Sequence, residues 1–255
     1  MSCCTTYLTD IKLSKYYDIF IKNKLGATMD YIDRLIFWAN KLKMPYKKIG
    51  ENAYEGLPRD RDTLLSIEYL HLYNIDSFFI NPDIFQLTTL KYLGISDSKI
   101  LCLPNDIENL TNLQDLILSN NCLLVLSPKL KKLENLFRLD LSHNYLYLIQ
   151  NVIFELPTLL ELDISYNQLK TIPKDIAKLH KLSDLILSHN QISSIPNELC
   201  DLSLLCVLDL SHNAISSIPS DFTKLKKLQE LYLNDNVLVD IPDFKEIKSL
   251  YEVVL

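Results

Sequence analysis

A spacing of 23 residues runs through the chain and constrains its fold more than any other feature. Two apolar residues follow each anchor leucine at offsets three and five, for example Leu139 and Leu141 after Leu136. An asparagine follows at offset eight. The anchor leucines are Leu90, Leu113, Leu136, Leu159, Leu182, Leu205 and Leu228, and the asparagines are Asn121, Asn144, Asn167, Asn190, Asn213 and Asn236. A fixed period of this length indicates repeats that stack on one another.

Each repeat predicts a short strand followed by a tight turn. Side chains alternate along a strand, so the apolar residues at offsets three and five point the same way. One repeat cannot bury that side alone, and we therefore expect neighbouring strands to pair in parallel. The asparagine amide is both donor and acceptor, so it can satisfy backbone groups inside the turn. Ile-Pro pairs at 172–173, 195–196, 218–219 and 241–242 predict the start of a short helix or 3₁₀ segment.

The pattern LxxLxLxxNxLxxIPxxIxxL resembles the leucine-rich repeat. Its 23-residue length and Ile-Pro pair are most similar to the intracellular, Ras-suppressor-like class. The resemblance implies an α/β fold: a right-handed solenoid or horseshoe with a parallel sheet on its concave face and short helices or 3₁₀ segments on its convex face. It covers about four-fifths of the chain.

The repeat extends towards both ends. Ile67, Leu70 and Leu72 lie one period before the Leu90 unit. Residues 44–66 are expected to be a degenerate first repeat, which begins at Met44 and has matching Asn52 and Leu57-Pro58 but poor strand positions at Lys47 and Ile49. We therefore expect about nine repeats from 44 to 249 and a terminal strand at 250–255, which together form a domain at 44–255.

Residues 1–43 do not follow the repeat and predict two helices. The first has an apolar face and lies between a possible cap at Thr9 and Gly26. The second has a possible cap at Thr28 and is stopped by Pro45. The apolar faces consist of Leu13, Tyr16, Tyr17, Phe20 and Ile21 in the first helix, and of Ile32, Leu35, Ile36, Ala39 and Leu42 in the second. We interpret 1–43 as a helical cap over the first repeat; the alternative is an independent helical domain, for which forty residues make a poor core.

At the other end the chain stops on a strand. An open parallel edge can pair with another chain. Three explanations stay open: the strand itself caps the solenoid, two copies pair there as a homodimer, or the natural protein continues. The ending Val253-Val254-Leu255 also has the form of an apolar peptide ligand.

Composition restricts the class of protein. Apolar residues make up 48% and charged residues 23%, which indicates a globular chain. With only four glycines there is no Gly-rich phosphate loop, and a net charge of −6 argues against nucleic acid as a partner. No apolar run is long enough for a transmembrane segment, and no signal peptide is evident. Six cysteines without CxxC spacing predict reduced thiols and a cytoplasmic location.

The charges that flank the strand leucines are unbalanced. From residue 67 onwards, eleven acids and two bases are expected on the concave face. The acids are Glu68, Asp97, Asp115, Asp140, Glu161, Asp163, Asp184, Asp209, Glu230, Asp235 and Glu252, and the bases are Lys91 and Arg138. This face predicts a protein partner with a basic surface. The alternative is a solvated charged face, because Asp in LDLS is common in leucine-rich repeats generally.

Aromatic and apolar residues add possible anchors to this face, since tyrosine is favoured at interfaces. Phe137 and Leu160 form an apolar spot on successive strands. The predicted partner-binding residues are Phe137, Arg138, Asp140, His143, Leu160, Glu161, Asp163, Tyr166, Asp184, His189, Asp209, His212, Glu230 and Tyr232.

The tetrapeptide LSHN occurs three times and resembles a catalytic fragment. Its histidines, at offset seven, are His143, His189 and His212. Its serines are expected on a surface ladder with no pocket above them, and a nucleophile needs a base and an orienting group converging on it. His189 and His212 are expected to be neighbours on successive strands, with His143 two strands away beyond Tyr166. The neighbouring pair with Asp184 or Asp209 could hold a metal weakly, and a solvated pair is the simpler interpretation. We expect no catalytic, metal or cofactor site.

The function predicted from sequence is a non-catalytic scaffold for protein–protein interaction. The Ras-suppressor-like resemblance implies a small GTPase or a signalling enzyme as the partner class. Composition rich in Ile, Lys, Asn and Tyr is similar to leucine-rich-repeat effectors of intracellular bacteria, which are secreted into host cells. Some effectors carry a ubiquitin-ligase domain, for which no room is expected after residue 255. The alternatives are a homodimeric adaptor and a weak metal or enzymatic site at His189 and His212.

Overall fold

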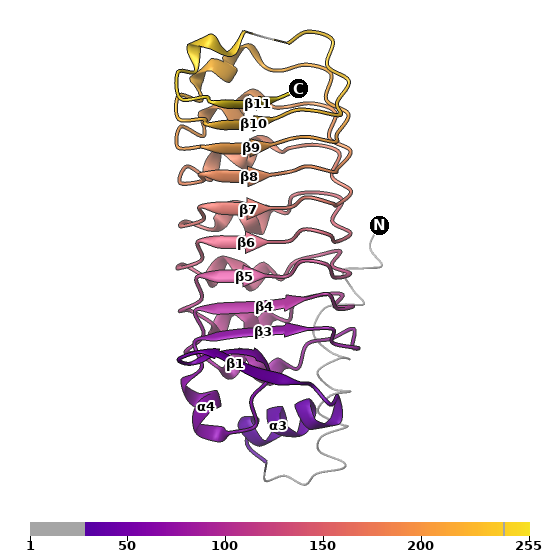
Figure 1. Ribbon diagram of the computed structural model, residues 1–255, viewed down its shortest axis with the longest axis vertical. Helices are drawn as coiled ribbons and strands as arrows, with labels where there is room; N and C mark the ends of the chain where they lie inside the picture. The colour runs from indigo at the N-terminus through magenta and orange to yellow at the C-terminus, as the bar shows by residue number, and fades with distance from the viewer. Residues whose placement is uncertain (1–28, 242) are drawn as a thin grey trace.

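A computed structural model of the chain describes residues 29–241 and 243–255. These residues form an elongated solenoid in which eleven strands make one sheet in chain order, with short helical segments behind it (Figure 1). The predicted α/β solenoid with a parallel sheet is confirmed. The strands are β1 (Tyr46–Gly50), β2 (Ala53–Gly56), β3 (Tyr69–Tyr73), β4 (Tyr92–Ser96), β5 (Asp115–Ile117), β6 (Arg138–Asp140), β7 (Glu161–Asp163), β8 (Asp184–Ile186), β9 (Val207–Asp209), β10 (Glu230–Tyr232) and β11 (Glu252–Val254).

The strand register follows the 23-residue period. Leu139 pairs with Leu162 between β6 and β7, and Leu185 pairs with Leu208 between β8 and β9. The leucines at offsets zero, three and five are almost fully buried along the length of the solenoid. One continuous apolar core therefore runs behind the sheet, as stacking of repeats requires.

A 3₁₀ segment follows each of the strands β3 to β10. The predicted Ile-Pro pairs place Pro173, Pro196 and Pro219 at the N-caps of η5, η6 and η7, and Pro128 is the first residue of η3. Their fixed φ suits both positions. The segments are η1 (Pro82–Gln86), η2 (Asn105–Asn109), η3 (Pro128–Lys132), η4 (Asn151–Glu155), η5 (Lys174–Lys178), η6 (Asn197–Asp201), η7 (Ser220–Lys224) and η8 (Phe244–Glu246).

The predicted asparagine ladder is confirmed. Asn144 Nδ2 donates to the carbonyl oxygens of Leu118, Leu141 and Ser142 at 2.9–3.1 Å. Its Oδ1 accepts from the backbone N–H of Leu123 at 2.9 Å. Each asparagine thus joins its own turn to the preceding repeat. Buried backbone groups would otherwise lack partners, so the residue repeats for structural reasons.

The helix α3 (Tyr31–Lys41) covers the N-terminal end of the solenoid. Ile32, Leu35 and Ala39 are buried, as the predicted apolar face requires. Its N-cap is Asp30, whose carboxylate accepts from Asp33 N–H, so the prediction of a cap at Thr28 is wrong. The prediction for residues 9–26 lies outside the described residues.

The first strands differ from the predicted degenerate repeat at 44–66. β1 and β2 form an antiparallel hairpin, and it is β2 that pairs in parallel with β3, Tyr54 opposite Leu70. Lys47 and Ile49 lie in the exposed β1, so their assignment to the repeat strand is wrong. Asn52 is wrong as a ladder residue, because it occupies the hairpin turn with φ 49°.

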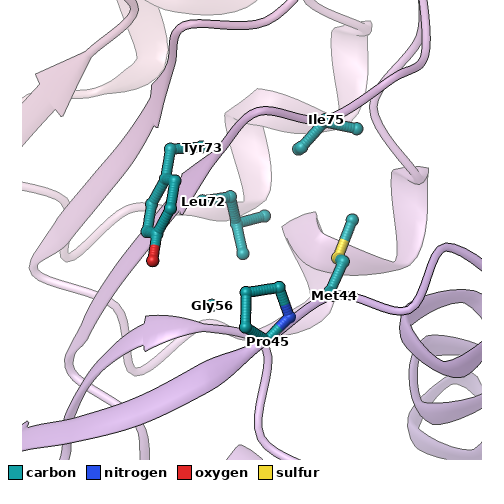
Figure 2. Close-up of a pocket in the computed structure, with 6 residues that line it drawn as sticks. All are labelled: Met44, Pro45, Gly56, Leu72, Tyr73 and Ile75. Carbon is teal, nitrogen blue, oxygen red and sulfur yellow. The ribbon is translucent and has the colours of Figure 1, made fainter.

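The hairpin and the helix α4 (Arg61–Ser66) complete this end of the molecule. Gly56 has φ 74°, and a Cβ there would collide with the Pro45 carbonyl oxygen, so the hairpin needs glycine. Figure 2 shows Met44 and Pro45 close to Leu72 and Ile75, around a small niche. The niche has room for about one water molecule. We therefore regard it as a seam between cap and repeats and not as a ligand pocket.

At the other end, β11 is the last strand of the sheet. It pairs in parallel with β10, Val253 opposite Leu231, and all three of its residues are exposed. The expected terminal strand is therefore present. Pairing of two copies through it remains a prediction, as does the division of the chain at residue 44.

Candidate functional site

The predicted binding residues lie along β6–β10 and the turns that follow these strands. Parallel register aligns Arg138, Glu161 and Asp184 on three successive strands. Arg138 Nε lies 3.3 Å from Glu161 Oε2. The period of the repeat thus gathers side chains that are 23 residues apart in sequence into rows across the sheet.

A second row of carboxylates is held by hydrogen bonds within its own repeat. Asp163 Oδ1 accepts from the Ser165 N–H at 2.8 Å and from its hydroxyl at 2.6 Å. Asp140 and Asp209 make the same pair of bonds. These aspartates fold the chain tightly where each strand ends.

The hydrogen bonds from serine overturn one prediction. The expected exposed ladder consisted of Ser119, Ser142, Ser165, Ser188 and Ser211, but Ser119 is only partly exposed and the other four are buried. In three of these repeats the hydroxyl turns back to the aspartate two residues earlier. The sequence DLS therefore describes a local hydrogen-bonded turn, and its serine is not presented to a partner.

Asp163 lies between two other carboxylates. Burial raises its pKa above the usual aspartate value, the hydrogen bonds from Ser165 oppose this rise, and the charges of Asp140 and Asp209 add to it. An unpaired, half-buried carboxylate in this environment favours either a proton or a nearby cation. A positive group placed over Asp163 would therefore stabilise its charged form.

Four rings stack along the edge where the strands end. The ring centroids of His143 and Tyr166 lie 4.0 Å apart, those of Tyr166 and His189 lie 3.9 Å apart, and those of His189 and His212 lie 4.0 Å apart. Interplanar angles of 11–15° make this a continuous parallel stack, which we call the ring column. The neighbour relations agree with the sequence analysis, which did not predict the stacking itself.

The backbone restricts which residues stand in this column. All eight equivalent positions have φ between 50° and 56°, the left-handed region. They are Asn74, Asp97, Asn120, His143, Tyr166, His189, His212 and Asp235. Asn, Asp and His are several-fold enriched there. Histidine recurs in LSHN because this left-handed turn accepts it. Tyr166 is the one residue of the eight that does not belong to the enriched types.

His143, Tyr166 and His212 of the ring column are exposed, and His189 is partly exposed. Slight burial and the neighbouring His212 lower the pKa of His189, while Asp209 raises it. His212 Nε2 lies 3.3 Å from Asp235 Oδ2. Because ring nitrogens bind metal in the ring plane, parallel stacked imidazoles do not converge on one ion. Among the described residues, no three His, Cys, Asp or Glu side chains are grouped to hold a metal.

Apolar and phenolic groups lie beside the charged rows. Phe137 and Leu160 are adjacent through a 2.8 Å backbone hydrogen bond, and each side chain is 39% exposed. Glu230 accepts from the Tyr232 hydroxyl at 3.1 Å and from the Tyr251 hydroxyl at 2.6 Å. The face therefore offers carboxylates together with aromatic and aliphatic anchors.

One cluster near β3 and β4 was missed. Tyr69 and Tyr92 stack at 3.9 Å, and His71 Nε2 lies 2.8 Å from Ser96 Oγ. Burial lowers the pKa of His71. A Cβ at Gly94 would collide with the His71 ring, so the glycine makes room for it. The sequence signal that could have revealed this cluster is the pair of His71 and Gly94, which lie at offset four of successive repeats.

The fold and these rows can now be compared with known proteins. A family model described as leucine rich repeat matches residues 134–192 and 182–238. A leucine-rich repeat protein of Leptospira interrogans has 32% sequence identity and a TM-score of 0.64 over 74% of this chain and 54% of that one. The chain is a leucine-rich repeat protein. Members of this family are typically non-enzymatic scaffolds.

Other solved leucine-rich repeat structures are similar. A plant peptide hormone receptor, RGFR1, in complex with RGF2 has 28% identity and a TM-score of 0.64, covering 76% of this chain and 32% of that one. The TLR13–ssRNA13 complex has 30% identity and a TM-score of 0.68, covering 76% of this chain and 29% of that one. This leucine-rich repeat chain spans about half of the Leptospira protein and about a third of the other two.

Two further observations concern the chain as a whole. A comparison with curated protein sequences gives no match. No helix within residues 29–241 and 243–255 is long and apolar enough to cross a membrane.

Proposed function

We propose that this leucine-rich repeat protein is a non-catalytic scaffold that binds a protein with a basic surface on the outer face of its sheet, over β6–β10. The fold supports protein–protein interaction in general. The observation that supports the finer proposal is the excess of carboxylates at the positions that flank the strand leucines, where the sequence has eleven acids and two bases from residue 67 onwards.

Both bases of this face are already engaged. Lys91 Nζ lies 3.0 Å from Glu68, and Arg138 lies 3.3 Å from Glu161. A half-buried carboxylate such as Asp163 gains most from an approaching cation, because burial weakens solvent screening. A basic surface would therefore be steered to the face and held there.

The ring column and the Phe137–Leu160 spot supply anchors of the kind that concentrate binding energy. Arginine suits such a face, since its planar guanidinium stacks on aromatic rings and pairs with carboxylates. The similar structures include one complex with a peptide hormone and one with single-stranded RNA. The net charge of −6 favours a protein over RNA here.

We further propose a biological setting, which is supported by composition and by the likeness to a bacterial leucine-rich repeat protein. In this setting the chain is a bacterial effector that is secreted into a host cell. It acts in the host cytoplasm on small-GTPase, ubiquitin or other signalling pathways. Host-cell fractionation after infection, with the tagged full chain, would detect it in the host cytoplasm. Retention in the bacterium would reject this setting.

The binding face is tested by charge reversal at carboxylates that are not part of the aspartate–serine turns. The triple variant Glu161→Lys, Asp184→Lys and Glu230→Lys should weaken capture of a basic partner from host lysate by at least about tenfold. The matched control, Asp175→Lys, Asp201→Lys and Asp221→Lys, changes net charge equally within or at the end of η5, η6 and η7. If both triple variants lose partner capture equally, the binding site does not lie on this face.

A second candidate function is homodimerisation, favoured by the exposed strand β11. Sedimentation of the full chain over a wide concentration range measures it directly. A dimer that dissociates on Val254→Lys supports pairing through this edge, and a monomer at high concentration rejects it.

A further inference from the structure

A polar groove lies over the turns that follow β3, β4 and β5, outside the binding face proposed above. Its volume is about 510 Å³. Small-molecule sites in proteins have volumes of about 300–1,000 Å³. Two rows of side chains line the groove, with Ser98 between them: Asn74, Asp97 and Asn120 at offset seven, and Asp76 and Lys99 at offset nine.

The groove ends where the ring column begins. Offset seven holds the short side chains of Asn74, Asp97 and Asn120 in three repeats, and the rings of His143 and Tyr166 follow in the next two. All five residues have the same left-handed backbone, so the turn itself does not decide between a short polar side chain and a ring. The first three repeats therefore carry a different chemistry from the ring column on the same backbone.

Hydrogen bonds within the groove hold its side chains in place. Asn120 Nδ2 donates to Asp97 Oδ1 at 2.6 Å, and Lys99 Nζ donates to Asp76 Oδ1 at 2.9 Å. Within the part of the chain that the structure describes, the side-chain amide of Asn74, the amide oxygen of Asn120 and the second oxygen of Asp76 have no hydrogen-bond partner. The groove therefore presents donors and acceptors that are still available to a ligand.

The chemistry of these groups selects the class of ligand. The carboxylates of Asp76 and Asp97 repel a free anion, and a free cation has to compete with Lys99. An apolar ligand gains little, because Ile75 is the apolar member of the lining and is 3% exposed. A hydroxyl group both donates and accepts, so a neutral molecule with several hydroxyls matches carboxylate, amide and ammonium groups together.

Aromatic rings lie at both ends of the offset-seven row. Tyr73 comes directly before Asn74 and is 40% exposed. At the other end, Tyr166 stacks on one face of the His143 ring, so the opposite face is turned towards the repeat of Asn120. The face of an aromatic ring is negative and attracts C–H groups such as those of a sugar ring. A saccharide therefore finds ring faces beside its hydrogen-bonding partners.

We propose that the groove binds a short neutral saccharide. Two strand spacings of about 4.8 Å place Asn74 and Asn120 about 10 Å apart, which is the length of a disaccharide. The Asp97 carboxylate and the Asn120 amide bind adjacent hydroxyls of one sugar ring, and Asp76 with Lys99 binds the next ring. The site lies outside the proposed protein-binding face, so either proposal can fail without the other.

NMR titration of the isotope-labelled full chain tests the proposal. The probes are the neutral disaccharides maltose, cellobiose, lactose and N,N′-diacetylchitobiose, with glucuronate and glucosamine as charged sugars and glycerol as an acyclic polyol. We expect at least one neutral disaccharide to shift the backbone amides of Asp97, Ser98 and Asn120 in a saturable way, with the amide of Asn236 unchanged. The charged sugars and glycerol should bind at least about tenfold more weakly.

Two variants at Asp97 separate the carboxylate from the turn. Asp97→Gly removes the side chain and Asp97→Asn removes only its charge, and both residues suit a φ of 50°. Asp97→Gly should weaken disaccharide binding at least about tenfold, and Asp97→Asn should weaken it less. The matched control Asp235→Gly removes a carboxylate from the same offset near the other end of the solenoid, where φ is 56°, and should leave binding unchanged. Thermal unfolding checks that each variant is folded.

Three results would overturn the proposal. If no neutral disaccharide shifts the groove amides, the groove is not a saccharide site. If Asp97→Gly and Asp235→Gly weaken binding equally, the sugar binds elsewhere on the chain. If glycerol, glucuronate or glucosamine binds as tightly as the disaccharides do, the groove does not select a neutral saccharide.

Discussion

Two neighbouring columns along the ends of the strands follow opposite rules. The asparagine column, from Asn121 to Asn236, is turned inward and repeats without variation over six units. The column one residue earlier is turned outward and holds Asn, Asp, His and Tyr. Both are set by the same turn, yet only the first is fixed by hydrogen bonds of its side chain.

The difference separates structure from function in this fold. An asparagine of the inner column makes up to four hydrogen bonds to backbone groups, so no other residue replaces it fully. The outer column is restricted only by a left-handed backbone, which leaves its chemistry free to serve a partner. LSHN thus combines two structural residues and one buried serine with one histidine whose side chain is available.

The largest expected effect is on the inner column. Asn167→Ala removes donors to Leu141, Ile164 and Ser165 and the acceptor for Leu146. Unpaired buried backbone groups should lower the free energy of unfolding by about 2–4 kcal/mol. Urea denaturation measures this loss, and Tyr166→Asn in the outer column is the control, with an expected change within about 0.5 kcal/mol.

The aspartate–serine turns should show an intermediate effect. Asp163→Ala leaves Ser165 without its acceptor and is expected to cost about 1–2 kcal/mol relative to Asp163→Asn, which keeps an oxygen in place. Because the pKa of Asp163 is raised in the folded state, its charge costs stability above that pKa. Asp163→Asn should therefore be at least as stable as the wild type at pH 7 by urea denaturation. If Asp163→Asn is less stable than the wild type at pH 7, this account of the Asp163 carboxylate is wrong.

A smaller effect tests the backbone rule for the outer column. Tyr166 has φ 52°, a conformation that β-branched residues adopt poorly. Tyr166→Val should destabilise the fold by about 1 kcal/mol more than Tyr166→Asn does. Equal stabilities of the two variants in thermal unfolding would show that the turn does not select residues by backbone conformation.

The smallest expected effect concerns pH. The pKa of His189 is lowered in the folded state, so the unfolded chain binds protons more readily. Stability contributed by neutral His189 is present above the unfolded pKa and is lost as pH falls through it. His189→Asn, which suits the left-handed backbone, should reduce the loss of stability between pH 7.5 and pH 5.5. An unchanged pH profile would reject a role for this ring.

The sequence predicted the parts of the fold that recur in phase. Strand register, the asparagine ladder and the proline-started 3₁₀ segments all follow from residues repeated every 23 positions. Residues 44–66 were mispredicted because Asn52 and Leu57-Pro58 match the pattern by spacing alone. The pairing of Tyr54 with Leu70, 16 residues apart, is set by a hairpin that periodicity does not reveal.

For the candidate site, the sequence predicted which residues lie on neighbouring strands but not how their side chains contact one another. Register along β6–β10 places side chains in rows, as expected. Burial of Ser165 and stacking of the ring column depend on hydrogen bonds and side-chain rotamers within one turn, which spacing does not encode. The Gly94–His71 contact likewise depends on a missing side chain on the adjacent strand.

The central claim is that the varied outward residues of β6–β10 bind the partner while the repeated residues hold the fold. Side-chain oxidation footprinting of the free and partner-bound chain tests it most directly. Phe137, Tyr166 and His212 should become protected by the partner, whereas Tyr46 on β1 and the exposed His180 after η5 should react as before. Protection of Tyr46 or His180 with Phe137 and Tyr166 unchanged would contradict the account.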